Sequence, residues 1–314
     1  MKKNIIVIII LVIMALVIGL YLRNRNQLPE GVNEGSIIVD GLTRNYLYHI
    51  PDNKDNLPLV IALHGGLGSG KRMIDLTENG FTELSDKEEF IIVYPDGIET
   101  HWNDGRAIQE YKTQRENIDD VKFISKLIDK FINDFHADPQ RVYVTGISNG
   151  GFMSYRLACE LSDKIAAIAP VAGEIPKNIV SSCRPSRAIP VLAINGKNDP
   201  LVLWEGGHLQ LKDQFLGDTL SAEKSVEHFA SLNGCSLNST VTDLPNVDVS
   251  DGTTIKKIEY SNCDLGKEVT LYEIEGGGHT WPGGWQYLPE SVVGKTSRDI
   301  DANKVIWDFF KEHG

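Results

Sequence analysis

The sequence predicts an α/β protein in which helices cover both faces of a mostly parallel sheet. Runs that are apolar at every position, as expected for strands buried on both sides, recur at residues 57–63, 90–94, 142–145, 165–171 and 189–194. Helical patterns separate the runs. The clearest covers residues 118–135, where apolar side chains follow the period of a helix and Asn117 is the predicted N-cap. Alternating strands and helices of this kind favour a parallel sheet.

The two ends of this pattern complete the sheet. Residues 36–39 and 44–50 flank Asp40-Gly41, a turn signal, and predict an antiparallel hairpin at one sheet edge. Residues 269–274 predict a last strand, and residues 301–310 a closing helix.

The N-terminal segment is continuously apolar over residues 5–22 and is flanked by lysines and arginines. A helix of this length spans roughly 27 Å, close to the thickness of a bilayer core. A cleaved signal peptide and an uncleaved anchor both remain open, and the length and the lack of an Ala-x-Ala site favour the anchor. Both predict export to the cell surface or the exterior. We therefore expect an anchor or signal segment at residues 1–23, a linker at 24–35 and one domain at 36–314.

Composition excludes some classes of partner. The chain has 43 acidic and 31 basic side chains, a formal charge of −12, so its surface repels polyanions and nucleic acid is not an expected partner. Apolar residues make up 41% and charged residues 24%, as in ordinary globular proteins. Membrane contact is expected through the N-terminal segment alone, and oligomeric state is left open.

The four cysteines are expected to be paired, because an even number in an exported protein is more often oxidised than free. Three pairings are possible. The sequential one closes two short loops, joining Cys159 to Cys183 and Cys235 to Cys263. Metal ligation is the weaker alternative, since no Cys-x-x-Cys spacing occurs. We expect neither a metal nor a cofactor.

A nucleophile motif follows the run at 142–145. Gly-Ile-Ser-Asn-Gly, centred on Ser148, precedes a stretch that can form a helix. In a strand-turn-helix setting, flanking glycines leave room for a strained turn that projects the serine hydroxyl. The same turn places the Asn149 amide at a helix N-terminus, where it can donate to an oxyanion. A glycine-rich loop with an incidental serine is the alternative for the motif taken alone.

A second glycine-rich loop, His-Gly-Gly-Leu-Gly-Ser-Gly from His64, follows the run at 57–63. Glycines let the backbone approach a reacting carbonyl oxygen closely. We expect Gly66, or alternatively Leu67, to supply the second oxyanion amide. A phosphate-binding loop fits less well, because the run lacks the Gly-Lys-Ser/Thr ending. The His64 ring is expected to be a structural hydrogen-bonding group.

An acid and a base are found after two later strands. Asp199 follows the run at 189–194, and His279 lies in a glycine-rich loop after residues 269–274. Each alone has an ordinary explanation, a turn aspartate and a solvated histidine. The order Ser148, Asp199, His279 is that of the α/β-hydrolase fold, in which the histidine takes the serine proton and the aspartate orients it. The pattern therefore predicts an ester-cleaving serine enzyme.

These motifs resemble those of secreted polyhydroxybutyrate depolymerase-like and feruloyl-esterase-like carbohydrate esterases. The resemblance runs from about Arg44 to the C-terminus and is most specific at Gly-Gly-Gly-His-Thr-Trp-Pro-Gly-Gly around His279. It implies an α/β-hydrolase fold, hydrolysis of short-chain, hydroxyalkanoate or feruloyl-type esters, and the pairings Cys159–Cys183 and Cys235–Cys263. We recognise no substrate-adsorbing module, so soluble small or oligomeric esters are the expected substrates.

Fewer sequence features indicate which residues line a substrate pocket. Trp102, Trp204 and Trp281 are candidates to line the acyl or alcohol pocket, and a buried core position suits each equally well. Residues 204–219 form either a mobile lid or an ordinary loop. A peptidase or acyltransferase with the same triad, and a catalytically silent cell-surface binding protein, are the alternative functions.

Overall fold

The structure is a computed structural model that describes residues 27–52, 55–211 and 213–314. Within it, residues Asn33–Gly314 form one compact unit. The apolar segment at residues 5–22, predicted to be an anchor or signal segment, lies outside the described residues. Among the helices that are described, none has the length and apolar character needed to cross a membrane.

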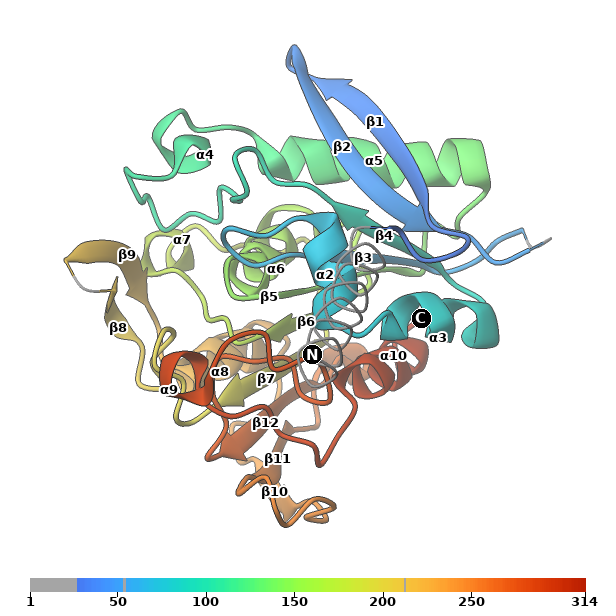
Figure 1. The fold of residues 1–314 in the computed structure, drawn as a ribbon. Helices are drawn as coiled ribbons and strands as arrows, with labels where there is room; N and C mark the ends of the chain where they lie inside the picture. The colour runs from blue at the N-terminus through green and yellow to red at the C-terminus, as the bar shows by residue number, and fades with distance from the viewer. Residues whose placement is uncertain (1–26, 53–54, 212) are drawn as a thin grey trace, which may run out of the picture. The chain divides into compact units, whose positions relative to one another are not determined.

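One large sheet of ten strands organises the unit (Figure 1). Its order is β1-β2-β4-β3-β5-β6-β7-β12-β11-β10. The strands in chain order are β1 (Asn33–Val39), β2 (Leu42–His49), β3 (Leu59–Leu63), β4 (Ile91–Pro95), β5 (Val142–Ile147), β6 (Ala167–Val171), β7 (Val191–Gly196), β10 (Thr240–Asp243), β11 (Thr254–Tyr260) and β12 (Val269–Glu275). The six from β4 to β12 in the sheet order pair in parallel, and both ends of the sheet are antiparallel. The predicted mostly parallel sheet and its edge hairpin are confirmed.

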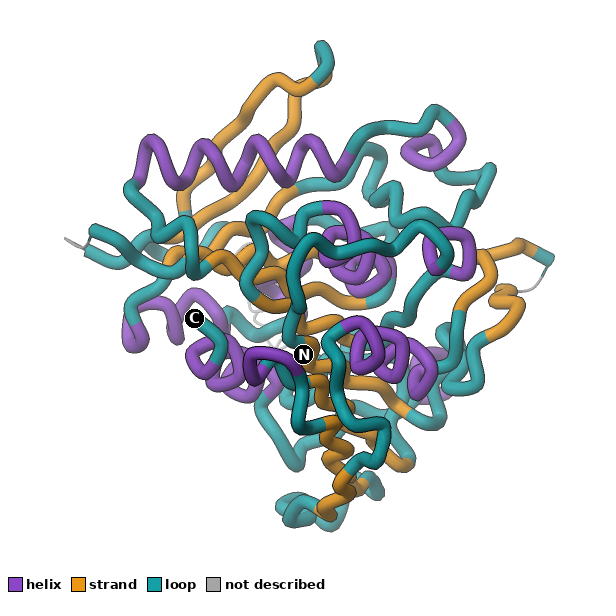
Figure 2. The backbone as a smooth tube through the Cα atoms, turned by 180° about the vertical axis from the view of Figure 1, so that it is seen from behind, coloured by secondary structure: helices purple, strands orange, loops and turns teal. Residues whose placement is uncertain are grey.

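Helices cover both faces of the sheet. Two adjacent residues of β5 show this, because their side chains point to opposite faces. Val144 belongs to a core cluster with Phe123 and Met153 of α5 and α6. Its neighbour Tyr143 faces the other way and stacks on Phe310 of α10, with ring centroids 4.7 Å apart. The helices are α2 (Gly70–Leu76), α3 (Gly80–Glu88), α4 (Lys112–Arg115), α5 (Asp120–Phe135), α6 (Asn149–Glu160), α7 (Lys177–Val180), α8 (Ala222–Leu232), α9 (Glu290–Val293), α10 (Ala302–Glu312) and a 3₁₀ turn at Asp264–Gly266. Figure 2 shows the helices and strands from behind.

The structure corrects two local predictions. Asn117 does not cap the long helix: α5 begins at Asp120, and the Asp119 carboxylate accepts a hydrogen bond of 2.8 Å from the Lys122 amide. Asn117 instead adopts a left-handed φ of 48° within the preceding turn. The predicted linker at 24–35 also ends too late, because β1 already begins at Asn33.

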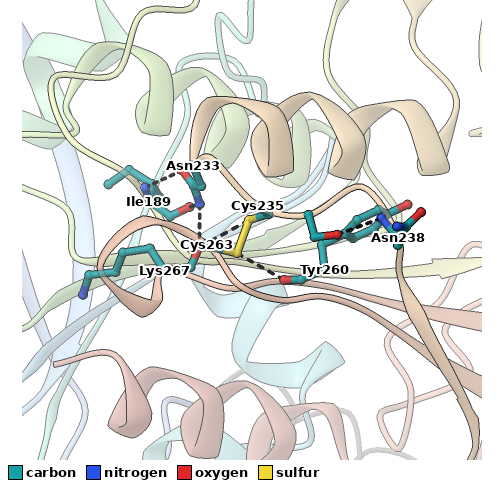
Figure 3. Close-up of a disulfide and its surroundings, with 8 residues drawn as sticks. Ile189, Asn233, Cys235, Asn238, Tyr260, Cys263 and Lys267 are labelled. Atoms are coloured by element: carbon teal, nitrogen blue, oxygen red, sulfur yellow. Dashed lines mark hydrogen bonds between the residues drawn. A yellow bond between two sulfur atoms is a disulfide. The ribbon is translucent and has the colours of Figure 1, made fainter.

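Two disulfides join the predicted partners, Cys159 with Cys183 and Cys235 with Cys263. All four cysteines are therefore paired. Near the second bridge, the Asn233 amide group bonds the backbone of Ile189, before β7, and of Lys267, before β12 (Figure 3). Disulfides persist in oxidising compartments, so this pairing is consistent with export.

We expect the paired substitution Cys159→Ala with Cys183→Ala to lower the free energy of unfolding by about 3 kcal/mol. The bridge closes a loop with a sequence separation of 24 residues, so the unfolded chain gains freedom when it is removed. Urea unfolding of the oxidised proteins measures the difference. Peptide mapping is the control, and a peptide linking Cys159 to Cys235 would contradict the pairing.

Candidate active site

Three strands of the parallel region position the serine, the aspartate and the histidine predicted from the sequence. Ser148 follows β5, Asp199 lies in the loop after β7, and His279 lies in the loop after β12. Because β5, β6, β7 and β12 are successive parallel strands, their carboxyl ends meet at one edge of the sheet. The aspartate and histidine loops are also bonded to each other, since the Asn198 amide donates to the Gly277 carbonyl at 2.9 Å.

Ser148 occupies a strained turn between β5 and α6. Its φ of 55° and ψ of −120° lie outside the usual regions for a residue with a side chain. The turn is tight because the flanking glycines touch backbone: a Cβ on Gly146 or Gly150 would lie 2.7 or 2.3 Å from the Leu63 carbonyl oxygen. The serine itself is partly exposed. This is the geometry of a nucleophile elbow.

Asp199 and His279 form a buried pair. The His279 Nδ1 lies 2.7 Å from the Asp199 Oδ2, and both residues are at most 5% exposed. The other carboxylate oxygen accepts hydrogen bonds from the amides of Leu201 and Val202, at 2.7 and 2.8 Å. Three contacts therefore fix the carboxylate. Among the described residues, the Ser148 side chain makes no hydrogen bond. The serine–histidine hydrogen bond of a triad is therefore not formed in this conformation.

The short helix α9 and the segment before it hold the histidine loop. The His279 amide donates to the Val293 carbonyl at 2.6 Å, and the Tyr287 hydroxyl donates to the His279 carbonyl at 3.0 Å. Burial, and secondarily the Asp199 charge, raise the pKa of Tyr287, so its hydroxyl remains a donor. Neither residue lies in a recognisable motif, so the sequence predicted no role for either.

The glycine-rich loop after β3 lies against the elbow. The Gly68 amide donates to the Gly65 carbonyl at 3.0 Å, which closes a turn at residues 65–68. Leu67 adopts a φ of 60° in this 65–68 turn, and its side chain is 68% exposed. A Cβ on Gly65 would lie 3.4 Å from the Ser148 Cβ. In the described chain, the Gly66 amide donates to no acceptor and therefore remains available.

The side chain of Asn149, directly after the serine, clamps a second loop to the elbow. Its Oδ1 accepts from the Trp102 amide at 2.7 Å, and its Nδ2 donates to the Trp102 carbonyl at 3.1 Å and to Asp104 at 2.5 Å. Asp104 is fully buried and also accepts from Arg106 and Gln114. Asn149 thus contributes its side chain to the architecture, beyond the amide expected from the sequence. The run His-Trp-Asn-Asp at residues 101–104 was the available signal.

The structure favours the core alternative for the three candidate pocket tryptophans. Trp102 and Trp281 are fully buried, and their indole nitrogens donate to the His64 carbonyl and the Asn303 side chain. Side chains without exposed surface are core residues and do not line an open pocket. Trp204 is 7% exposed and belongs to the core cluster.

Residues 204–219 include a small hairpin of β8 (Gly207–Leu211) and β9 (Gln214–Thr219), separate from the main sheet. Two buried groups attach it to the domain. The Arg106 guanidinium donates to the Leu216 carbonyl at 2.8 Å, and the Thr219 hydroxyl donates to Glu174 at 2.6 Å. Burial, opposed by this hydrogen bond, raises the pKa of Glu174 well above its usual range. The sequence predicted neither strand. Movement of residues 204–219 as a lid stays a prediction.

His64 has a structural position, as the sequence predicted. It is 1% exposed, its Nδ1 lies 2.7 Å from the Gly65 carbonyl oxygen, and its Nε2 accepts from the Gly97 amide at 2.9 Å. Both ring nitrogens are therefore used by the backbone in the neutral tautomer. Burial lowers the pKa of His64 to about 4. No group of three or more His, Cys, Asp or Glu side chains suited to a metal occurs among the described residues.

Comparisons with known proteins place the chain in a family. No family model matches it. It is 33% identical over 285 residues to the putative esterase NocK of Nocardia uniformis subsp. tsuyamanensis, a match covering 87% of this chain and 80% of that protein. It is 30% identical over 242 residues to feruloyl esterase B of Piromyces equi. The chain belongs to this feruloyl-esterase-like family of carboxylic ester hydrolases.

The matches cover only part of the length of some relatives. The match to feruloyl esterase B covers 74% of this chain and 42% of that protein. Poly(3-hydroxyalkanoate) depolymerase C of Paucimonas lemoignei is 25% identical over 256 residues, 58% of its length. The structure of an acetyl xylan esterase from Aspergillus awamori superposes with a TM-score of 0.58 at 16% identity, covering 89% of this chain and 99% of that one. The esterase therefore has the predicted α/β-hydrolase fold.

We expect the His64→Gln variant of the esterase to lose less stability in acid than the parent protein. In the unfolded chain a histidine titrates near 6.5, so the unfolded state binds the proton first. The stability that the neutral ring contributes is complete above about pH 6.5 and is lost as the pH falls toward 4, at roughly 1.4 kcal/mol per pH unit. Urea unfolding between pH 7.5 and 4.5 measures the slope. The exposed His208→Gln is the control, and equal slopes in all three proteins would contradict this account.

Proposed function

We propose that the esterase cleaves carboxylic esters through an acyl-enzyme on Ser148, with His279 as general base and Asp199 as the orienting acid. The buried hydrogen bond of 2.7 Å between Asp199 and His279 is the observation that carries the proposal. The strained, partly exposed serine at the same edge of the sheet supports it.

The contacts define the role of each group. With Nδ1–H donated to Asp199, the Nε2 of His279 carries the lone pair that accepts the serine proton during attack. The Asp199 carboxylate, fixed by the Leu201 and Val202 amides, then stabilises the imidazolium. The imidazolium protonates the leaving alcohol, and a water molecule, activated in the same way, hydrolyses the acyl-enzyme.

The oxyanion of each tetrahedral intermediate is stabilised by backbone amides. We assign this role to the amides of Gly66 and Asn149, with Leu67 as the alternative to Gly66. A Cβ on Gly66 would lie 3.9 Å from the Asn149 Cβ, which supports convergence of the two amides. The clamp from Asn149 to Trp102 keeps the elbow amide in place before substrate arrives. Each such donor contributes roughly 3 kcal/mol to the transition state in comparable enzymes.

Short-chain acyl, hydroxyalkanoate and feruloyl-type esters are the proposed substrates. The relatives carry names that refer to feruloyl, acetylxylan and hydroxyalkanoate esters, which supports this range. Peptide cleavage and acyl transfer use the same groups and remain alternatives at this site. The two disulfides support export. We further propose that residues 5–22 anchor the exported esterase in the membrane.

Ser148→Ala is expected to lower kcat for a short-chain p-nitrophenyl ester at least 10³-fold, because no other group replaces the nucleophile. The melting temperature should stay close to that of the parent. Ser250→Ala, at an exposed turn serine, is the matched control and should retain full activity. Turnover by Ser148→Ala within a few-fold of the parent would refute the assignment.

An acyl-length series tests the substrate range. We expect kcat/KM for long-chain triglyceride to be at least about tenfold below that for acetyl or feruloyl esters, from the discrimination that pockets typically achieve. Steady-state kinetics on acetyl, butyryl and feruloyl esters and on an oleoyl ester of glycerol, a triglyceride, measure the ratio. Preference for the oleoyl ester would identify a lipase instead.

A further inference from the structure

The β8–β9 hairpin lies outside the main sheet but packs on two elements that carry groups of the site. Its residue Leu216 packs against a small apolar cluster of Phe152, Val202 and Leu209. Phe152 lies in α6, the helix that follows the elbow, and Leu209 belongs to the hairpin itself. Val202 donates its amide to the Asp199 carboxylate at 2.8 Å. The hairpin therefore supports both the helix after the elbow and the loop of Asp199.

Arg106 connects the same hairpin to the elbow through a guanidinium group in which every nitrogen has a partner. Nη1 donates to the Leu216 carbonyl at 2.8 Å, while Nε and Nη2 lie 2.9 and 2.7 Å from the Asp104 Oδ2. That carboxylate oxygen also accepts from the Asn149 side chain. The guanidinium lies over the Phe152 ring as well, with its central carbon 4.1 Å from the ring centroid. A continuous chain of contacts thus joins the hairpin to the residue whose amide we assign to the oxyanion.

Burial makes this connection costly to break. Arg106 is 5% exposed and Asp104 is fully buried, so either charge without its partner would carry a large desolvation cost. A planar guanidinium can bond a carboxylate and a carbonyl at the same time, whereas a lysine ammonium offers a single nitrogen. Holding Asp104 and the hairpin together therefore requires an arginine at position 106.

The hairpin backbone lies directly on the Arg106 side chain at Gly217. Gly217 has a φ of 101°, and a Cβ there would lie 2.8 Å from the Cβ and the Cδ of Arg106. Gly207, in the other strand of the hairpin, has a similar φ of 94°, and a Cβ there would meet no atom within 4 Å. The two glycines therefore impose a similar backbone demand and differ in their contact with Arg106.

We propose that Arg106 is a positioning residue for ester cleavage, through which the β8–β9 hairpin holds the Asn149 amide and the Asp199 loop in their reactive positions. The inference rests on the proposed attack by Ser148. Arg106 acts through Asp104 and Asn149, and we assign it no contact with the substrate. A hairpin in this role changes the chemical step for every ester alike, whereas a hairpin that only controls access would affect large esters most.

Gly217→Ala in the full-length esterase tests the inference, because it pushes the hairpin off Arg106 and leaves every buried charge in place. We expect kcat for p-nitrophenyl acetate and p-nitrophenyl butyrate to fall about tenfold alike, with KM within about twofold of the parent value. Gly207→Ala is the matched control. It introduces similar backbone strain into the same hairpin and should leave both constants unchanged.

Arg106→Lys tests the same connection from the other side. Lysine retains a positive charge for Asp104, so the buried carboxylate stays paired, but it cannot also bond the Leu216 carbonyl. We expect the same direction and size of change in kcat. A trifluoromethyl ketone, which binds a reactive serine as a tetrahedral oxyanion, gives an independent measurement. Its inhibition constant should rise about tenfold in both variants, which a loss of thermal stability alone would not cause.

The outcomes separate this inference from the proposed mechanism. Full activity in both Gly217→Ala and Arg106→Lys would overturn the positioning role, and so would a loss that appears in KM alone or grows with the size of the ester. A reduced kcat with an unchanged inhibition constant would overturn it too. In each of these cases cleavage at Ser148 stands. Arg106→Lys decides alone if Gly217→Ala does not fold. Hydrolysis that survives in Ser148→Ala would overturn the proposed function, and the positioning role with it.

Discussion

The parallel pairing of β5, β6, β7 and β12 is the constraint on which the site depends. It places the loops carrying Ser148, Asp199 and His279 at one edge of the sheet, although 131 positions separate the first from the last (279 minus 148). Burial of these strands on both faces fixes their register, because a slip by one residue would turn every side chain to the opposite face. The core therefore aligns the three loops, which need only short backbone hydrogen bonds to hold these side chains.

A second layer of contacts controls the backbone around Ser148. Asn149 joins the elbow to Trp102 and Asp104, and Asp104 is in turn neutralised by Arg106. Arg106 also reaches the β8–β9 hairpin through the Leu216 carbonyl. The elbow, the loop after β4 and the hairpin consequently share one buried polar network. In such a network, each group left unpaired would cost the free energy of its desolvation.

Patterns that are visible in short stretches of the sequence predicted much of the fold and part of the candidate site. The apolar runs predicted the sheet. The glycines around Ser148 predicted the elbow, and the chain order of serine, acid and base predicted the pairing of Asp199 with His279. The Asn149 clamp was not accessible, since its partner Trp102 is 47 positions away and asparagine suits many environments. The tryptophans could not be assigned from the sequence for a related reason: near a site motif, a large aromatic ring fits a pocket and a core equally well, and Trp102 and Trp281 are core residues. Hairpin β8–β9 forms a separate two-stranded sheet and carries a weak sequence pattern.

The buried Glu174 has a consequence for the energetics of folding. Burial raises the pKa of its carboxyl above the value in an unfolded chain, so folding takes up a proton at every pH between the two values. The stability associated with this group is complete below the unfolded value and is lost as the pH rises toward the folded one. His64 has the opposite dependence. The heat of unfolding measured by calorimetry will therefore vary with the ionisation enthalpy of the buffer, and the net number of protons exchanged will reflect both residues.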